Sequence, residues 1–162
     1  MSYRILVVNP GSTSTKIGVY EDENLLFDKT LRHSAEELEK FDSIPAQKDW
    51  RRKLVMKALE DQGFDVKTLS AVSGRGGLLA PIRGGTYAVS DRLVRDCTVG
   101  VQGQHASNLG GIIAREIGDQ LGIPVDFTVS VDLTGFEALV DAIDGKDDGK
   151  IVEEAGDVLM QA

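Results

Sequence analysis

Hydrophobic and polar positions in the first thirty residues follow the pattern of β-strands. "YRILVVNPG" is a near-continuous aliphatic run that ends at Asn9, which is typical of a buried central strand. "TKIGVYED" and "NLLFDKTLRHS" give two further strand patterns, with a hairpin turn expected over Asp22 to Asn24. We therefore predict that the chain opens with three antiparallel strands joined by turns.

Helical periodicity begins after the third strand. Ser34, with Glu37 three residues later, forms a capping-box pattern at the start of "SAEELEKF". Longer helices are predicted from about Ala46 to Gln62, ended by Gly63, and over "HASNLGGIIAREIGDQLG", ended by Gly122. Their predicted apolar faces are Leu54, Met56 or Val55, Leu59 and the stem of Trp50 in the first helix, and Leu109, Ile112, Ile113, Ile117 and Leu121 in the second.

Shorter patterns fill the rest of the chain. A buried strand is expected at about Ser70 to Ser73, and "GTYAVSDRLVRDC" predicts a short strand followed by the start of a helix. "IPVDFTVSVD" alternates at Phe127, Val129 and Val131 as a strand does, and "GFEALVDAI" and "KIVEEAGDVLMQA" predict two short final helices. Neither an internal repeat nor a low-complexity linker separates these elements.

Composition is that of an ordinary globular domain. The 162 residues are 41% hydrophobic and 27% charged, which is enough for one domain with a proper core. Apolar runs such as Ile5 to Val8 are too short to cross a membrane, and "MSYRILVV" lacks the layout of a signal peptide. We therefore expect a cytoplasmic protein without membrane contact. Cys97, the single cysteine, is interpreted as a small core residue.

Negative charge is concentrated at the end of the chain. From Asp126 onward there are ten Asp or Glu and two Lys, which account for the net charge of −8, and this argues against a nucleic-acid partner. Part of this segment resembles an EF-hand calcium loop, with fitting residues at Asp144, Asp148, Gly149 and Ile151. Because Lys146 and Ala155 occupy positions that should supply ligands, we interpret it as a solvated turn.

Three glycine-bearing polar turns follow strands or precede helices: Asn9 to Lys16, Gly74 to Gly77, and Gly103 to Gly111. Glycine lets backbone N–H groups approach an anion closely, and hydroxyl and ammonium groups add further donors. The first turn does not match GxxxxGK[ST] and leads into a strand, so it is neither a P-loop nor a Rossmann turn. From composition alone, a phosphate site and a plain hairpin turn stand as equal alternatives.

The residue sequences of these three turns, and their order along the chain, resemble the motifs of one enzyme family. "RILVVNPGSTSTKIGVY" resembles the first phosphate loop of the acetate and butyrate kinases, within the acetate kinase, sugar kinase, Hsp70 and actin superfamily. "SAVSGRGGLLAPIRGGTYAVS" resembles the family's arginine-bearing substrate loop, and "VGVQGQHASNLGGIIA" its histidine loop, in a wording closer to butyrate kinase. The resemblance covers about Tyr3 to Pro124. It implies an α/β fold, a ribonuclease-H-like (actin-like ATPase) domain with a mixed sheet and flanking helices.

The resemblance also implies a reaction, in which ATP and a short-chain carboxylate such as butanoate give ADP and an acyl phosphate with Mg²⁺ as metal. In that family the arginine that matches Arg75 holds the carboxylate and the transferring phosphoryl group. The histidine that matches His105 lies by the acyl group, and the asparagine that matches Asn9 lies near the phosphoryl group and the metal. The phosphate side would be lined by Gly11, Ser12, Thr13, Ser14 and Lys16.

Physical reasoning supports a clamp at Arg75, because a guanidinium matches a carboxylate or phosphate with two parallel hydrogen bonds. Each role has a plainer alternative. Arg75 could form a surface salt bridge, His105 could cap backbone groups, and strand alternation could aim Lys16 at solvent. His33 has no such context and is interpreted as a surface strand residue.

Beyond Pro124 the resemblance ends. The family continues with an acidic strand residue, which Asp126 matches only loosely, and with a second domain; its second histidine and second arginine have no counterpart here. We therefore expect residues 1–124 to form the kinase-like domain and residues 125–162 an unmatched acidic strand-helix-helix ending packed on it. The predicted function is that of a butyrate kinase-like fragment, inactive or very weak alone. The alternative is a non-catalytic fragment that binds anions or a partner, and self-association is one way to bury its orphaned face.

Overall fold

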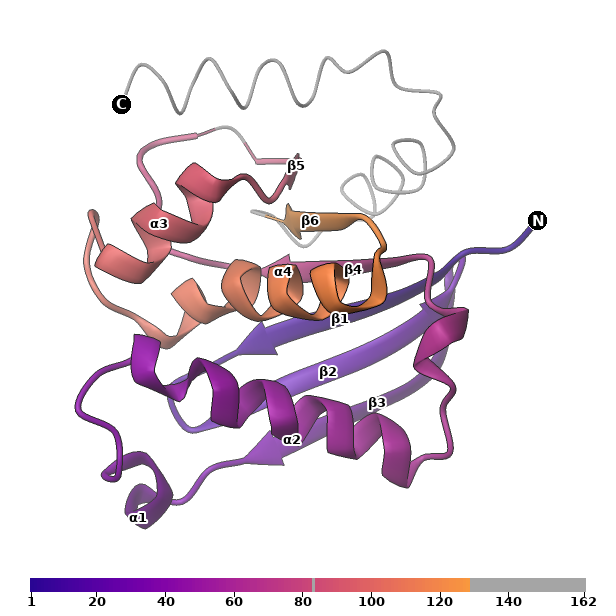
Figure 1. Ribbon diagram of the computed structural model, residues 1–162, viewed down its shortest axis with the longest axis horizontal. Helices are drawn as coiled ribbons and strands as arrows, with labels where there is room; N and C mark the ends of the chain where they lie inside the picture. Colours follow the sequence, from indigo (N-terminus) through magenta and orange to yellow (C-terminus); the bar gives the residue numbers. More distant parts are fainter. Residues whose placement is uncertain (83, 129–162) are drawn as a thin grey trace.

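A six-stranded mixed sheet, in the order β3-β2-β1-β4-β6-β5, carries the fold of the computed structural model, which describes residues 1–82 and 84–128 (Figure 1). The strands are β1 (Arg4–Pro10), β2 (Ser14–Glu21), β3 (Asn24–Arg32), β4 (Ala71–Arg75), β5 (Thr86–Ala88) and β6 (Val125–Thr128). The first three strands pair antiparallel as predicted, whereas β1, β4 and β6 run parallel to one another and β5 pairs antiparallel with β6. The predicted α/β class with a mixed sheet is confirmed.

The helices are α1 (Ala35–Leu38), α2 (Lys48–Asp61), α3 (Asp91–Val99) and α4 (Leu109–Leu121), and 3₁₀ turns span Pro45–Gln47, Val66–Thr68 and Ala106–Asn108. In Figure 1, α2 lies across β2 and β3, and α4 lies across β1 and β4 on the same face of the sheet. The core between them is built from Leu6, Val8, Ile17, Val19, Val55, Leu59, Ile113 and Ile117. None of the helices in the described residues is long and apolar enough to cross a membrane.

Local signals predicted the start of α1 and the ends of α2 and α4, although α2 and α4 begin later, at Lys48 and Leu109, than the predicted segments do. The capping box is confirmed, because Ser34 Oγ accepts the N–H of Glu37 while the Glu37 carboxylate accepts the N–H of Ser34. Gly63 and Gly122 follow α2 and α4 with φ of 66° and 68°, a left-handed conformation that favours glycine. The two final predicted helices, the EF-hand-like turn and Val129 and Val131 lie outside the described residues.

The face of α2 differs from its apolar pattern. Val55 and Leu59 are buried as predicted, but Leu54 and Trp50 are only half-buried, and the large fully buried side chain is Arg51, 1% exposed. In α4 the predicted face is buried except for the half-buried Leu121. The helix α2 therefore packs on the sheet with one charged side chain, that of Arg51, where the sequence predicted only apolar contacts.

Cys97 lies in the core, which confirms its interpretation. Its side chain is fully buried on α3, and burial, together with the neighbouring carboxylate of Asp96, raises the pKa of the thiol to about 11. The thiol is therefore protonated at neutral pH and packs as a small apolar group.

The prediction for His33 was wrong. Its side chain is buried, with only 5% exposed, and Nε2 lies 2.9 Å from Thr15 Oγ1. The ring lies against the Trp50 ring, with 4.7 Å between centroids. The alternation along β3 gives no sign of this burial, because the side chain that covers His33 comes from α2.

His33 makes the stability of the domain sensitive to acid. Burial and, second, the positive charge of Arg51 lower its pKa below the usual 6.5. As pH falls below about 6.5, the unfolded chain takes up this proton first, so the free energy of unfolding decreases with falling pH. We expect urea denaturation to show this decrease between pH 7.5 and 5.5, and the variant His33→Gln to show a smaller one.

His105→Gln is the matched control, because His33 and His105 are the only histidines and His105 is exposed. The slope measured for His33→Gln is compared with the slope of this control and with that of the original protein. An equal slope in His33→Gln and the original protein would contradict the assignment.

Candidate functional site

The first turn, between β1 and β2, directs its carbonyl groups into the protein. The guanidinium of Arg51 donates from Nη1 to the carbonyl oxygens of Gly11 and Ser14, at 2.8 and 3.1 Å, and from Nη2 to that of Ser12, at 3.5 Å. The carbonyl of Thr13 accepts the backbone N–H of His33 at 2.8 Å. Every carbonyl from Gly11 to Ser14 is therefore satisfied from inside the protein.

The N–H groups of the same turn are arranged differently. The Gly11 N–H donates to Ser14 O at 2.7 Å, but within the described residues no acceptor is found for the N–H groups of Ser12 and Thr13, which are both exposed residues. Successive N–H groups that face outward from a turn form a concavity suited to an anion.

Arg51 holds its position under the turn without a carboxylate partner. Gln47 Oε1 accepts from its Nε and Nη2 at 3.1 and 2.9 Å, and Thr15 Oγ1 accepts from Nη1 at 3.1 Å. Among the described residues no Asp or Glu forms an ion pair with it. Burial lowers its pKa to about 10, so the side chain stays positively charged at neutral pH.

At the carboxyl ends of β1 and β4, the parallel register aligns two of the predicted site residues. The parallel register pairs Val8 with Gly74, and Asn9 and Arg75 are the next residues in each strand. Because side chains alternate along a strand and Gly74 abuts α4, Asn9 and Arg75 belong to the sheet face opposite α4. Arg75 is exposed.

Lys16 faces solvent, as alternation allowed. It pairs with Asn9 across the antiparallel register and is an exposed residue, and its Nζ forms an ion pair with Asp28 on β3 at 3.4 Å. Its predicted contact with phosphate would require this exposed pair to open.

The histidine loop lies against the arginine loop. Beyond Arg75, Gly76 and Gly77 adopt φ of 88° and 122°, and a Cβ added at Gly76 would lie 3.0 Å from Ser107 Cβ. His105 is exposed and caps the 3₁₀ turn, since its Nδ1 accepts the Ser107 N–H at 3.1 Å. The capping alternative is therefore present, and it places the proton of a neutral ring on Nε2, which is left as a donor.

Asn108 ties the two loops together and was missed from the sequence. Its side chain is buried; Oδ1 accepts the Leu78 N–H at 2.8 Å, and Nδ2 donates to Gly103 O at 2.9 Å. The only signal in the sequence is an amide residue placed directly before Leu109, where the helix that contains the glycine pair begins. The relative position of Arg75 and His105 depends on this amide.

Replacing Asn108 with alanine is expected to lower the free energy of unfolding by about 1–3 kcal/mol, because it removes the hydrogen bonds by which this buried amide joins Leu78 to Gly103. Urea denaturation measures the change. Asn24→Ala, at an exposed asparagine in the hairpin between β2 and β3, is the matched control and should stay within about 0.5 kcal/mol. Equal stability of the two variants would show that the amide does not hold the loops.

The start of α4 presses directly on the end of β4. A Cβ added at Gly74 would lie 2.7 Å from the backbone N of Gly111 and nearer still to the carbonyl group of Gly110. A Cβ added at Gly110 would lie 2.5 Å from Arg75 O. The arginine loop is thus held against the helix by contact between backbone atoms.

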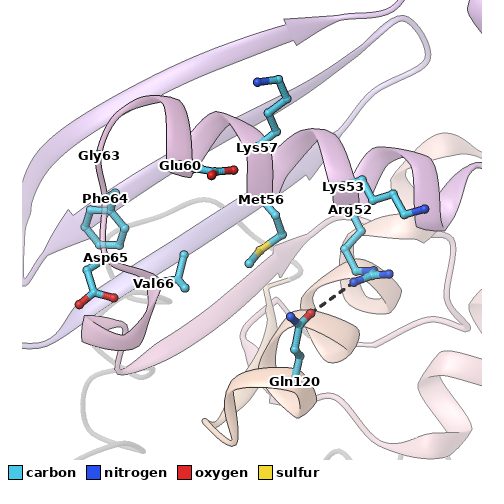
Figure 2. Close-up of a pocket in the computed structure, with 10 residues that line it drawn as sticks. All are labelled: Arg52, Lys53, Met56, Lys57, Glu60, Gly63, Phe64, Asp65, Val66 and Gln120. Carbon is cyan, nitrogen blue, oxygen red and sulfur yellow. Dashed lines mark hydrogen bonds between the residues drawn. The ribbon is translucent and has the colours of Figure 1, made fainter.

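An open groove lies elsewhere on the molecule. Figure 2 shows its lining from α2, the segment after α2 and the end of α4: Arg52, Lys53, Met56, Lys57, Glu60, Gly63, Phe64, Asp65, Val66 and Gln120. Residues 63–66 lead toward the amino end of β4, whereas the site loops follow the carboxyl ends of β1 and β4. The groove therefore lies between α2, the segment after it and the end of α4, and none of the three loops lines it.

No group of three His, Cys, Asp or Glu that could hold a metal ion is present in the described part of the chain. Asn9 would offer one amide oxygen, and the register places Asp126 beside Ser73 on the neighbouring strand. A metal at Asn9 therefore needs ligands from the substrate, water or residues outside the described ranges.

Comparison with known proteins identifies relatives of the matched segment. A probable butyrate kinase of Clostridium botulinum (strain Eklund 17B / Type B) is 57% identical over 124 residues, which are 76% of this chain and 35% of that protein. Butyrate kinase 1 of Clostridium acetobutylicum is 57% identical over 122 residues, 75% of this chain and 34% of that protein. The chain thus spans about a third of the length of the curated relatives it matches.

Structural comparison agrees on the fold. The acetate kinase of Entamoeba histolytica superposes with a TM-score of 0.50 over 78% of this chain and 34% of that chain, at 13% identity. No family model matches the chain. The resemblance to butyrate kinases and the actin-like ATPase fold drawn from the sequence are confirmed.

Proposed function

Because this chain is a homologue of the butyrate kinases over three quarters of its length, we propose that it forms the acceptor side of an acyl kinase. The proposed reaction transfers the γ-phosphoryl group of ATP to the carboxylate of butanoate, giving ADP and butanoyl phosphate. Residues 1–124 would form the kinase-like part, and residues 125–162 an ending packed on the same domain, whose first residues, Val125–Thr128, form β6 of the sheet.

The convergence of three loops at one edge of the sheet carries the proposal. The first turn follows β1, the Arg75 loop follows the neighbouring parallel β4, and the His105 loop packs on the Arg75 loop through Gly76 and Ser107. Phosphoryl transfer depends mainly on holding two anionic groups in line and stabilising their charge, and this edge offers donors for both.

Each residue has a distinct proposed role. The outward N–H groups of Ser12 and Thr13 bind oxygens of the transferring phosphoryl group, and Arg75 holds the carboxylate with two parallel hydrogen bonds. His105 donates from Nε2 to the acyl phosphate oxygen as charge develops there. The amide oxygen of Asn9 would help hold Mg²⁺, which when bound neutralises charge on the phosphates.

The 162 residues tested by themselves are expected to bind phosphate but to turn over poorly. In a phosphate titration followed by NMR, the amide signals of Ser12 and Thr13 should shift. With ATP, Mg²⁺ and butanoate, acyl hydroxamate formation should stay below about one thousandth of that of butyrate kinase 1 of Clostridium acetobutylicum, because nucleotide positioning and exclusion of water need more than a third of the family's length.

Two results would contradict this expectation. Turnover comparable to the reference enzyme would mean that residues from Asp126 onward build a nucleotide site. Phosphate shifts that avoid Ser12 and Thr13 would mean that the first turn is not the anion site.

A second candidate function, a non-catalytic fragment that binds an anion or a partner, is favoured by the outward N–H groups of Ser12 and Thr13, which need no second substrate to bind an anion. A chimera separates the two, in which the matched segment of this chain replaces the corresponding segment of the Clostridium acetobutylicum enzyme. Acyl hydroxamate formation by the chimera supports the kinase proposal. A folded chimera that binds phosphate without turnover supports the fragment.

A further inference from the structure

We propose that Arg51 is a positioning residue for the first turn: its guanidinium directs the N–H groups of Ser12 and Thr13 outward and places an unneutralised positive charge beneath the bound phosphoryl group. This inference rests on the proposed anion site at the turn. Arg51 itself is buried and touches only the protein side of the turn.

The planarity of the peptide unit carries the first half of the proposal. In a trans peptide the C=O of one residue and the N–H of the next point in opposite directions. The carbonyls of Gly11 and Ser12 are drawn inward by Nη1 and Nη2 of Arg51, so the N–H groups of Ser12 and Thr13 must point outward. These are the two N–H groups for which the described residues supply no acceptor.

The partners of the guanidinium carry the second half. A buried charged side chain is almost always paired with an opposite charge, because desolvation is costly. Arg51 instead contacts the neutral side chains of Gln47 and Thr15 and the carbonyls of the turn. An anion bound on the outer side of the turn would supply the opposite charge that the interior lacks.

Two substitutions separate geometry from charge. Arg51→Met removes both the guanidinium hydrogen bonds to the carbonyls of the turn and the positive charge. Gln47→Glu keeps the hydrogen bonds of Arg51 to the turn, because a carboxylate oxygen replaces the amide oxygen that accepts from Arg51. The carboxylate neutralises the positive charge of the guanidinium. Arg52→Met is the matched control, since Arg52 is the next cation on α2 and pairs with Glu116 instead of the turn.

The measurement is a titration with inorganic phosphate at pH 7, followed by the amide shifts of Ser12 and Thr13, with ¹⁵N relaxation of the same amides before phosphate is added. We expect Arg51→Met to raise the Kd about tenfold or more and to lower the order of both amides. Gln47→Glu should raise the Kd about three- to tenfold with the order unchanged. Arg52→Met should change the Kd by less than about twofold.

Contrary outcomes are distinct. An unchanged Kd in Arg51→Met or in Gln47→Glu would overturn the proposal for Arg51 while leaving the anion site in place. If Arg51→Met does not fold, Gln47→Glu decides alone. Absence of shifts at Ser12 and Thr13 in the unsubstituted protein would instead overturn the anion site, and with it the role given to Arg51.

Discussion

Arg75→Lys in the active chimera is expected to lower kcat/KM for butanoate about 30- to 1000-fold, which corresponds to roughly 2–4 kcal/mol of transition-state stabilisation. Lysine keeps the positive charge but offers a single point of attachment where the guanidinium offers two parallel donors. Because Arg75 is exposed and its loop is held by Gly74, Gly76 and Asn108, the substitution should leave the fold unchanged.

Arg95→Lys is the matched control for this experiment, because Arg95 is an exposed arginine on α3 whose guanidinium pairs with Asp96 of the same helix. Steady-state kinetics of the two variants, with urea denaturation to verify folding, give the comparison. Kinetics of Arg75→Lys within twofold of the control would show that Arg75 does not clamp the carboxylate.

Gly74→Ala should lower the free energy of unfolding by about 3 kcal/mol or more, a large share of the stability of a domain of this size. The added Cβ would meet backbone atoms of Gly110 and Gly111, which cannot move aside by changing a rotamer. Either β4 or α4 must shift, and a shift of β4 carries Arg75 away from Asn9. Urea denaturation measures the loss.

Gly85→Ala serves as the control, because the atoms nearest to a Cβ added there belong to the Tyr87 side chain at 3.7 Å or more. It should alter the free energy of unfolding by less than about 1 kcal/mol. If both glycine variants unfold at the same urea concentration, the contact between β4 and α4 is looser than the structure places it.

Elements with a local cause could be predicted from the sequence. The three opening strands follow from alternation and a short hairpin, the cap of α1 from the spacing of Ser34 and Glu37, and the end of α4 from Gly122. The neighbourhood of the first turn and the Arg75 loop was reached through family resemblance, because the pairing of β1 with β4 leaves no periodic signal in either strand.

Residues that act across the fold could not be predicted in the same way. Arg51 occupies a helix position where a charged residue ordinarily faces water, and His33 follows an exposed edge strand. Both are buried because α2 returns over the end of the hairpin and brings Trp50 and Gln47 with it. Only the three-dimensional contact shows that these side chains support the turn.

Because of the strand order, the first turn and the Arg75 loop differ in the entropic cost of being brought into place. Pairing β1 with β2 encloses only the four residues between Pro10 and Thr15, whereas pairing β1 with β4 joins Ile5 to Ala71 across two hairpins and the helices α1 and α2. Loop closure costs about 0.6 kcal/mol for each doubling of length, so the second pairing costs about 2 kcal/mol more. The first turn is therefore closed by the chain at a small entropic cost, whereas the position of the Arg75 loop depends on a long-range pairing that costs more.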